Sequence, residues 1–260
     1  MTSYNFDRVS DKYDATRGFP PGVSERVARW VLSRLPHDPA LLELGVGTGR
    51  IAVPFIELGV RYTGFDISEQ MLTRLTEKVG GDLRRARTLV HNIEEPFPLP
   101  EGSQDAVVAV HILHLVDAVK ALTHARRVLK PGGAVVWGYE SGFDHNPHTR
   151  LRARFHAEAE ANGWSKRDFH VPAARELLAS WGAVVTQHVI ATWAEEESLR
   201  SHLDRLRAKV YSFTWSMTDE QVATVADRTE AWALEEFGDL DQPRISERRF
   251  VIDWYVIGGT

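Results

Sequence analysis

The chain has 260 residues, of which 43% are hydrophobic, a formal net charge of −5 and no cysteine. This content suits a globular protein with a sizeable core, and the acidic balance argues against a nucleic-acid binder that depends on phosphate contacts. The lack of cysteine excludes disulfides, thiolate metal sites and a cysteine nucleophile. We expect a cytoplasmic protein without a membrane partner, because the polar start is no signal peptide and no apolar stretch reaches the length of a membrane span.

Residues 1–36 are predicted to form a helical arm, whose helix carries apolar residues at helical spacing from Val23 to Leu35. Strands and helices alternate after it, and Ser68 is the expected N-cap of one helix. The predicted strands are 40–45, 61–68, 86–92, 105–113 and 134–140. Helices are predicted over 48–59 and 116–129, and the breaker "KPGG" precedes the last of these strands. Such alternation, with strands that are apolar on both faces, predicts a doubly wound, Rossmann-like α/β fold with a parallel sheet.

The second half of the chain interrupts this alternation with two helical inserts, at about 141–170 and 195–241. A helix and a strand at 171–193 separate them, and a strand ends the chain. In the second insert, Thr218 and Gln221 form a capping box that opens a helix. We expect both inserts to cover the active site of a single domain. Aromatic residues of the second insert could wall an apolar acceptor pocket or only fix the helices in place: Tyr211, Phe213, Trp215 and Trp232.

The stretch "LLELGVGTGR", from Leu41 to Arg50, has glycine at three alternate positions after an apolar strand. Ligands of parallel sheets bind where the first strand turns into its helix, and a glycine-rich turn there lets the backbone approach them closely. The dinucleotide fingerprint G-x-G-x-x-G would need a third glycine where this chain has Arg50. About twenty residues later, Asp66 ends the second predicted strand, where a carboxylate can accept two hydrogen bonds from ribose hydroxyls.

"LLELGVGTGR" resembles the first motif of class I methyltransferases that use S-adenosylmethionine. The run from His91 to Trp137, which includes "LPEGSQDAVVAV" and "VLKPGG", resembles the next strand motifs of the ubiquinone-biosynthesis-like (methyltransferase type 11) branch. "KYDATRG" near the N-terminus is similar to another element of the family. The resemblance implies a seven-stranded, mostly parallel sheet with a C-terminal antiparallel strand. It also implies an enzyme that transfers a methyl group from S-adenosyl-L-methionine to a small molecule.

The same resemblance assigns roles to individual residues. The glycines would approach the amino-acid end of the cofactor with Glu43 beside them, and Tyr13 and Arg17 would close over its carboxylate. Ile67 and Met71 would pack on the sugar and adenine, although Met71 could equally be core. The whole predicted cofactor set is Tyr13, Arg17, Glu43, Gly45, Gly47, Gly49, Asp66, Ile67, Met71, Asn92, Ile93 and His111. Asn92, Ile93 and Glu94 would lie beside the adenine, with an amide where the family often has aspartate.

The sulfonium of the cofactor is a good leaving group, so in-line displacement needs no protein nucleophile. A general base helps only where the acceptor holds its proton, and His111 and His114 at the end of the fourth strand are the candidates. For each, a structural role is the alternative. His145 and His148 in "DHNPH" lack a carboxylate set, so no metal is predicted. An NAD-dependent oxidoreductase and a non-catalytic S-adenosylmethionine-binding protein remain as alternatives, in a monomer or homodimer.

Overall fold

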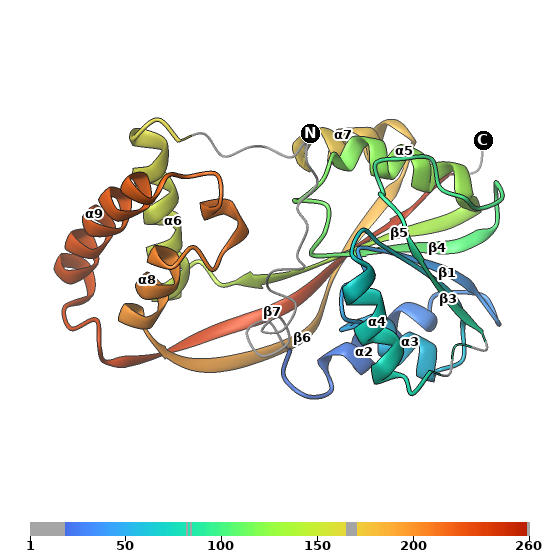
Figure 1. The fold of residues 1–260 in the computed structure, drawn as a ribbon, viewed down its shortest axis with the longest axis horizontal. Coiled ribbons are helices and arrows are strands. Elements are labelled where there is room, and N and C mark those ends of the chain that lie inside the picture. Colours follow the sequence, from blue (N-terminus) through green and yellow to red (C-terminus); the bar gives the residue numbers. More distant parts are fainter. Residues whose placement is uncertain (1–18, 82, 84, 165–170, 259–260) are drawn as a thin grey trace. The chain divides into compact units, whose positions relative to one another are not determined.

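The computed structural model describes residues 19–81, 83, 85–164 and 171–258 (Figure 1). The predicted site residues Tyr13 and Arg17 lie outside these residues. The chain divides into two compact units, each assembled from separate segments. The first unit comprises the described residues of 1–140, 168–191 and 250–260, and the second those of 141–167 and 192–249. Of the helices that the structure describes, none has the length and apolar character needed to cross a membrane.

A seven-stranded sheet runs through the described residues in the order β3-β2-β1-β4-β5-β7-β6 (Figure 1). Its strands are β1 (Ala40–Leu44), β2 (Arg61–Asp66), β3 (Ala86–Val90), β4 (Gln104–Val110), β5 (Leu129–Gly142), β6 (Val184–Ser198) and β7 (Pro243–Val256). Strand β1 pairs in parallel with β2 and β4, β2 with β3, and β4 with β5, whereas β7 is antiparallel. The predicted Rossmann-like fold with an antiparallel C-terminal strand is therefore confirmed.

Helices cover both faces of the sheet in the first unit (Figure 1). One face carries α2 (Val23–Leu32), α3 (Ala52–Glu57) and α4 (Glu69–Lys78), and the other carries α5 (Ala118–Val128) and α7 (Val171–Ser180). Two caps show how the sequence starts these helices. Ser68 Oγ accepts a hydrogen bond from Met71 N at 3.2 Å, and Asp117 Oδ1 accepts one from Lys120 N at 3.1 Å. All five residues of β1 are buried, so the turn that follows this strand starts from the middle of the core.

The sequence predicted that the "KPGG" segment ends a helix before β5 begins. In the structure, this segment belongs to β5 itself. The β4–β5 register passes from Gln104↔Leu129 directly to Ala106↔Ala134, so β5 carries extra residues that bulge out of the ladder. Lys130 Nζ lies 2.8 Å from both carboxylate oxygens of Asp105, which anchors the bulge to β4. Glycine in a bulge and glycine in a turn look alike in a sequence, which is why the prediction was wrong here.

The two predicted inserts fold together as one unit with its own core. Its helices are α6 (Pro147–Ala161), α8 (Leu199–Arg207), the short 3₁₀ helix η2 (Ser212–Thr214) and α9 (Asp219–Phe237). Fully buried leucines on α8 pack with apolar residues of α6 and α9. The capping box of α9 is confirmed, with Thr218 Oγ1 accepting from Gln221 N at 3.1 Å and Thr218 N donating to Gln221 Oε1 at 2.8 Å. Helix α8 begins at Leu199 rather than Glu195 because β6 continues to Ser198.

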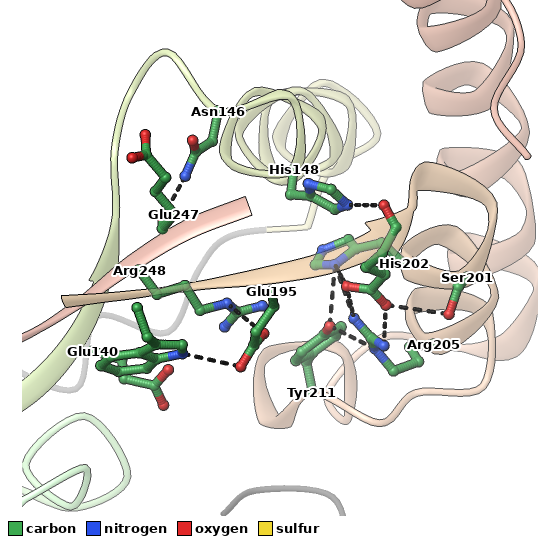
Figure 2. Close-up of polar contacts among 12 residues, drawn as sticks. Glu140, Asn146, His148, Glu195, Ser201, His202, Arg205, Tyr211, Glu247 and Arg248 are labelled. Carbon is green, nitrogen blue, oxygen red and sulfur yellow. Dashed lines mark hydrogen bonds and ion pairs between the residues drawn. The ribbon is translucent and has the colours of Figure 1, made fainter. Parts of the chain in front are cut away.

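A buried polar cluster lies at the start of α8 in the second unit (Figure 2). The two carboxylate oxygens of Glu197 pair with the guanidinium of Arg205, in one contact at 2.7 Å. Tyr211 Oη and Arg205 Nη2 both lie 3.3 Å from Nδ1 of His202, and His148 Nε2 lies 3.1 Å from the backbone oxygen of Glu197. His148 and His202 are 3% and 4% exposed, so this cluster is part of the interior of the unit.

Candidate active site

The turn after β1 is tied to the end of β2 by backbone hydrogen bonds. Gly45 N and Val46 N donate to the carbonyl oxygen of Phe65 at 2.8 and 3.1 Å. Gly47 N donates to Oδ2 of Asp66 at 2.7 Å. The three glycines of the turn have φ values of 68°, 57° and 91° at Gly45, Gly47 and Gly49, in the left-handed region that favours glycine.

The three glycines differ in what surrounds them. A Cβ atom on Gly45 would lie 2.5 Å from Cγ1 of Ile112, and one on Gly49 would lie 2.3 Å from Cδ1 of Leu75. A Cβ on Gly47 would meet nothing within 4 Å. Packing inside the chain therefore accounts for the absence of a side chain at two positions. Of the three glycines, only Gly47 has open space where a side chain would be, so a ligand can approach its backbone closely.

Asp66 is held in a fixed orientation at the end of β2. Its Oδ1 accepts a hydrogen bond from Ser68 N at 2.9 Å, while Oδ2 accepts the one from Gly47 N. A carboxylate accepts hydrogen bonds at both of its oxygens, which is the chemistry that the two vicinal hydroxyls of a ribose require. Ile67 beside it is 39% exposed and offers an apolar surface, whereas Met71 is 2% exposed and belongs to the buried face of α4.

The loop after β3 connects to the start of α5 through two further bonds. Asn92 Oδ1 accepts from Glu94 N at 3.0 Å, and Glu94 Oε1 accepts from Asp117 N at 2.9 Å. Ile93 between them is 5% exposed and packs in the core. Asn92 is only partly buried, and its amide nitrogen and one oxygen lone pair remain for a base such as adenine.

Glu43 places a carboxyl group inside β1, where it contacts the buried side chain of Tyr62. This contact was not predicted from the sequence. Glu43 is 2% exposed, and the hydroxyl of Tyr62 donates to its Oε2 at 2.9 Å. Burial raises the pKa of Glu43 to about 8, against the opposing effect of the Tyr62 hydrogen bond. Tyr62 stands on the neighbouring strand two residues before Gly64, the register partner of Glu43. Because residues two apart share a face of a strand, this pairing could have been found from the register.

A pocket opens at the carboxyl ends of β1 and β4. It is lined by Glu43, Gly45, Val46, Gly47, Thr48, Arg50, Ile51, Val110 and His111. Four of the predicted cofactor residues thus meet in one place. His114 is exposed on the turn that follows and does not line this pocket. Among the residues that the structure describes, no three histidine, aspartate or glutamate side chains gather as metal ligands.

His111 lies at the edge of this pocket in an uncommon backbone conformation, with a φ of 54°. Its N–H donates to the carbonyl oxygen of Gly138 at 3.1 Å, and its Nε2 lies 3.8 Å from Oε2 of Glu140 on β5. The rings of Phe19 and Phe250 have their centroids 6.1 and 6.5 Å from that of His111. Glu140 was not predicted, although it follows Gly138, the register partner of Val110, by two residues.

This arrangement fits S-adenosylmethionine. An open glycine turn can accept the backbone of an amino acid closely, and a carboxylate on the next strand can bind the ribose of a nucleoside. The carboxamide of Asn92 lies in the loop that follows β3 at the same edge of the sheet, where a base attached to that ribose would extend. The order of these groups across β1, β2 and β3 matches the order of the three parts of the cofactor.

Comparisons with known proteins show what this part of the chain is similar to. The methyltransferase domain family matches residues 42–137, which run from β1 into β5. The chain is 30% identical over 138 residues to an uncharacterised methyltransferase of Mycobacterium tuberculosis, covering 52% of each chain. It is 31% identical over 140 residues to the demethylmenaquinone methyltransferase of Clavibacter sepedonicus, covering 52% of this chain and 56% of that one. The chain therefore spans about half the length of the curated relatives that it matches.

A solved structure extends the likeness in fold beyond this segment. The crystal structure of a putative methyltransferase from Bacillus halodurans has a TM-score of 0.59 and 14% sequence identity, and the alignment covers 92% of this chain and 100% of that one. At this identity the likeness concerns the fold alone. The segment of residues 42–137, which contains the glycine turn, Asp66, Asn92 and His111, is therefore similar to the methyltransferase domain family.

Proposed function

We propose that the chain is an enzyme that transfers a methyl group from S-adenosylmethionine to a small-molecule acceptor. The observation that carries the proposal is the open backbone at Gly47, hydrogen-bonded to Asp66 inside a methyltransferase domain. A relative named demethylmenaquinone methyltransferase supports a small organic acceptor. The net charge of −5 also favours a small molecule over a nucleic acid.

The site residues divide the work of holding the cofactor. We assign the amino-acid end to the turn around Gly47, the ribose to Asp66 and Ile67, and the adenine to Asn92. When bound, the cofactor supplies a methyl group on a sulfonium sulfur, which leaves as a neutral thioether. The protein then has to hold the acceptor in line with the breaking bond and exclude water, and such positioning can contribute several kcal/mol to the rate.

The first test concerns the close approach at Gly47. Gly47→Ala should weaken the binding of S-adenosylhomocysteine at least tenfold in titration calorimetry, because the new Cβ would occupy the space of the ligand. Gly102→Ala is a matched control, since Gly102 has a φ of 59° and open space around it but lies in the turn before β4, at the opposite end of the sheet. Equal affinity in both variants would exclude Gly47 from the site.

The second test concerns the ribose. Asp66→Asn removes a charged acceptor, and the loss of charge-assisted hydrogen bonds should cost about 1.5 to 3 kcal/mol of binding free energy. Asp105→Asn is the control, because Asp105 likewise accepts a backbone bond from a neighbouring strand, with Ala40 N at 2.8 Å, but lies at the amino end of β4. Tight binding of NAD in place of S-adenosylhomocysteine would contradict the proposed function.

A further inference from the structure

We propose that Glu43 and Tyr62 make the binding of the cofactor release a proton. The carboxyl group of Glu43 is neutral in the empty pocket and ionises when the ammonium group at the amino-acid end of S-adenosylmethionine enters. Tyr62 is a positioning residue that acts through Glu43, since it does not line the pocket itself. This inference rests on the proposed function and adds to it a dependence of cofactor affinity on pH.

The pocket at the end of β1 has in its wall a carboxyl group that water barely reaches. Glu43 lines the pocket although it is only 2% exposed. Its register partners on the two neighbouring strands are Gly64 on β2 and Val108 on β4, and neither carries a charge. Ionising a carboxyl group in such surroundings is costly unless an opposite charge arrives. An ammonium group is therefore the part of an amino acid that this wall favours.

A tyrosine is built against this carboxyl group from the neighbouring strand. Tyr62 is 2% exposed, and its hydroxyl donates to Oε2 of Glu43 at 2.9 Å. A Cβ atom on Gly64 would lie 2.9 Å from both Oη and Cε1 of Tyr62, so the ring crosses β2 where Gly64 has no side chain. Glycine inside a strand weakens it and often marks such a close approach. The glycine thus allows the Tyr62 hydroxyl to reach Glu43.

The groups around Glu43 determine when it ionises. Burial raises its pKa to about 8, against the hydrogen bond from Tyr62, which favours the carboxylate. The charge of Asp66 raises this pKa further, and the charge of Arg50 in the turn lowers it. His111, after β4, also lines the pocket and is the other group there that can titrate near neutral pH. With a pKa of about 8, Glu43 is mostly neutral at pH 7 in the empty pocket.

The arrival of a cation changes this balance. An ammonium group beside Glu43 favours the carboxylate by charge. The O–H bond of the Glu43 carboxyl group breaks, its electron pair stays on oxygen, and the proton passes to water. Tyr62 keeps its own proton, because burial raises the pKa of its hydroxyl well above the ordinary value, and it remains a donor to the carboxylate that forms. Binding therefore releases about one proton at a pH below 8.

The first test counts the protons released at about pH 6.5. S-adenosylhomocysteine, which has the ammonium group, is titrated calorimetrically in two buffers of different ionisation enthalpy, and so is methylthioadenosine, which lacks the whole amino-acid end. The wild type should release about one proton with the first ligand and none with the second. Glu43→Gln should release none with either. Release that persists in Glu43→Gln would assign the proton to another group, such as His111, and would overturn the inference.

The second test follows the affinity with pH. The affinity of the wild type for S-adenosylhomocysteine should increase about tenfold from pH 6 to pH 7, because each bound ligand displaces one proton. Glu43→Gln should bind more weakly at pH 7 and show no such increase. Affinity for methylthioadenosine should stay constant within about twofold in both proteins. A wild-type affinity for S-adenosylhomocysteine that does not change with pH would overturn the inference.

The third test observes the neutral carboxyl group in the wild type and needs no variant. The infrared C=O band of a protonated carboxyl group should disappear when S-adenosylhomocysteine binds at about pH 6.5 and remain when methylthioadenosine binds. A spectrum with no loss of such a band would overturn the inference.

The role of Tyr62 is tested by Tyr62→Phe. This variant should bind S-adenosylhomocysteine roughly tenfold more weakly at pH 7, because a hydrogen bond to a charged group is lost, and methylthioadenosine as tightly as before. The C=O band of the empty protein should move to higher frequency, since the carboxyl group no longer accepts a hydrogen bond. Tyr255→Phe is the matched control, a 4% exposed tyrosine of β7 whose hydroxyl lies 3.4 Å from Arg175 Nη1 and which does not line the pocket. An unshifted band and equal affinities in both variants would exclude Tyr62 from this role.

Failure of this inference is distinguishable from failure of the proposed function. A wild type that binds S-adenosylhomocysteine without releasing a proton would overturn the inference and leave the proposed function intact. A wild type that binds neither S-adenosylhomocysteine nor S-adenosylmethionine at any pH would instead contradict the proposed function.

Discussion

At the scale of single residues, the ionisation of Glu43 is coupled to folding. Burial raises its pKa from 4.5 to about 8, so the folded state holds a proton that the unfolded state releases at lower pH. The contribution of Glu43 to stability is therefore fully present below pH 4.5 and is lost as the pH rises to 8.

Glu43→Gln tests this coupling, because glutamine keeps an acceptor for the Tyr62 hydroxyl and cannot ionise. The unfolding free energy of the variant relative to the wild type should rise by a few kcal/mol between pH 4.5 and pH 8. Denaturant unfolding at several pH values in this window measures the difference. A difference that stays constant with pH would show that Glu43 ionises equally in both states.

Residues of the candidate site that belong to a sequence motif could be predicted. Residues that only the pairing of strands brings to the site could not. The glycines and Asp66 stand in a recognisable pattern at strand ends, and the structure places Gly47 and Asp66 in contact. Tyr62 and Glu140 carry no motif, because their contacts with Glu43 and His111 come from strand neighbours that are distant in sequence. Ile93, which the resemblance places beside the adenine, is 5% exposed and packs in the core, and apolar character alone does not predict this burial.

At the scale of elements, capping residues predicted helix starts well. Ser68 and Thr218 cap α4 and α9 as expected, because their side-chain oxygens accept the N–H groups that a helix start leaves without partners. Strand lengths were less predictable. Both β5 and β6 extend beyond their apolar cores, since pairing with neighbours and not local hydrophobicity decides where a strand ends.

The polar cluster at the start of α8 should make the second unit sensitive to acid (Figure 2). Burial lowers the pKa of His202 from 6.5 to about 4. Below pH 6.5 the unfolded chain binds a proton that the folded state refuses, so stability is lost as the pH falls from 6.5 to 4. Burial alone would raise the pKa of Glu197, but its contacts with His202 and Arg205 outweigh this and lower it, so its own contribution is lost only at still lower pH.

His202→Gln should remove this loss of stability. Relative to the wild type, the unfolding free energy of the variant should rise by about 3 kcal/mol as the pH falls from 6.5 to 4. His37→Gln, an exposed histidine in the first unit, is the control and should follow the wild type. Parallel stability curves for His202→Gln and the wild type would show that His202 is protonated in the folded state as readily as in the unfolded one.

At the scale of the whole molecule, the chain combines a segment that matches the methyltransferase domain family, residues 42–137, with a second unit. Two separate segments, within 141–167 and 192–249, form this second unit. The sequence predicted each apolar stripe of the inserts and left open whether their aromatics wall a pocket or fix the helices. In the structure, Phe213 packs edge to face on Phe155 of α6 with centroids 6.0 Å apart, and the guanidinium of Arg154 on α6 lies 5.6 Å from the ring centroid of Trp232 on α9. These aromatics therefore fix the helices of the unit to one another. An apolar stripe shows that a helix packs against another element, but it does not show which element. The common core of α6, α8 and α9 was therefore not predictable from the sequence.

The central claim is that this chain moves a methyl group from S-adenosylmethionine to a small molecule. The most direct measurement incubates the protein with S-adenosylmethionine labelled in its methyl group and a panel of phenols, amines and carboxylates, and quantifies S-adenosylhomocysteine and labelled product together. We predict that both form in equal amounts with at least one acceptor, and that Gly47→Ala abolishes both while Gly102→Ala does not. Tight binding of S-adenosylmethionine with no labelled product from any acceptor would contradict the claim and identify a binding protein instead.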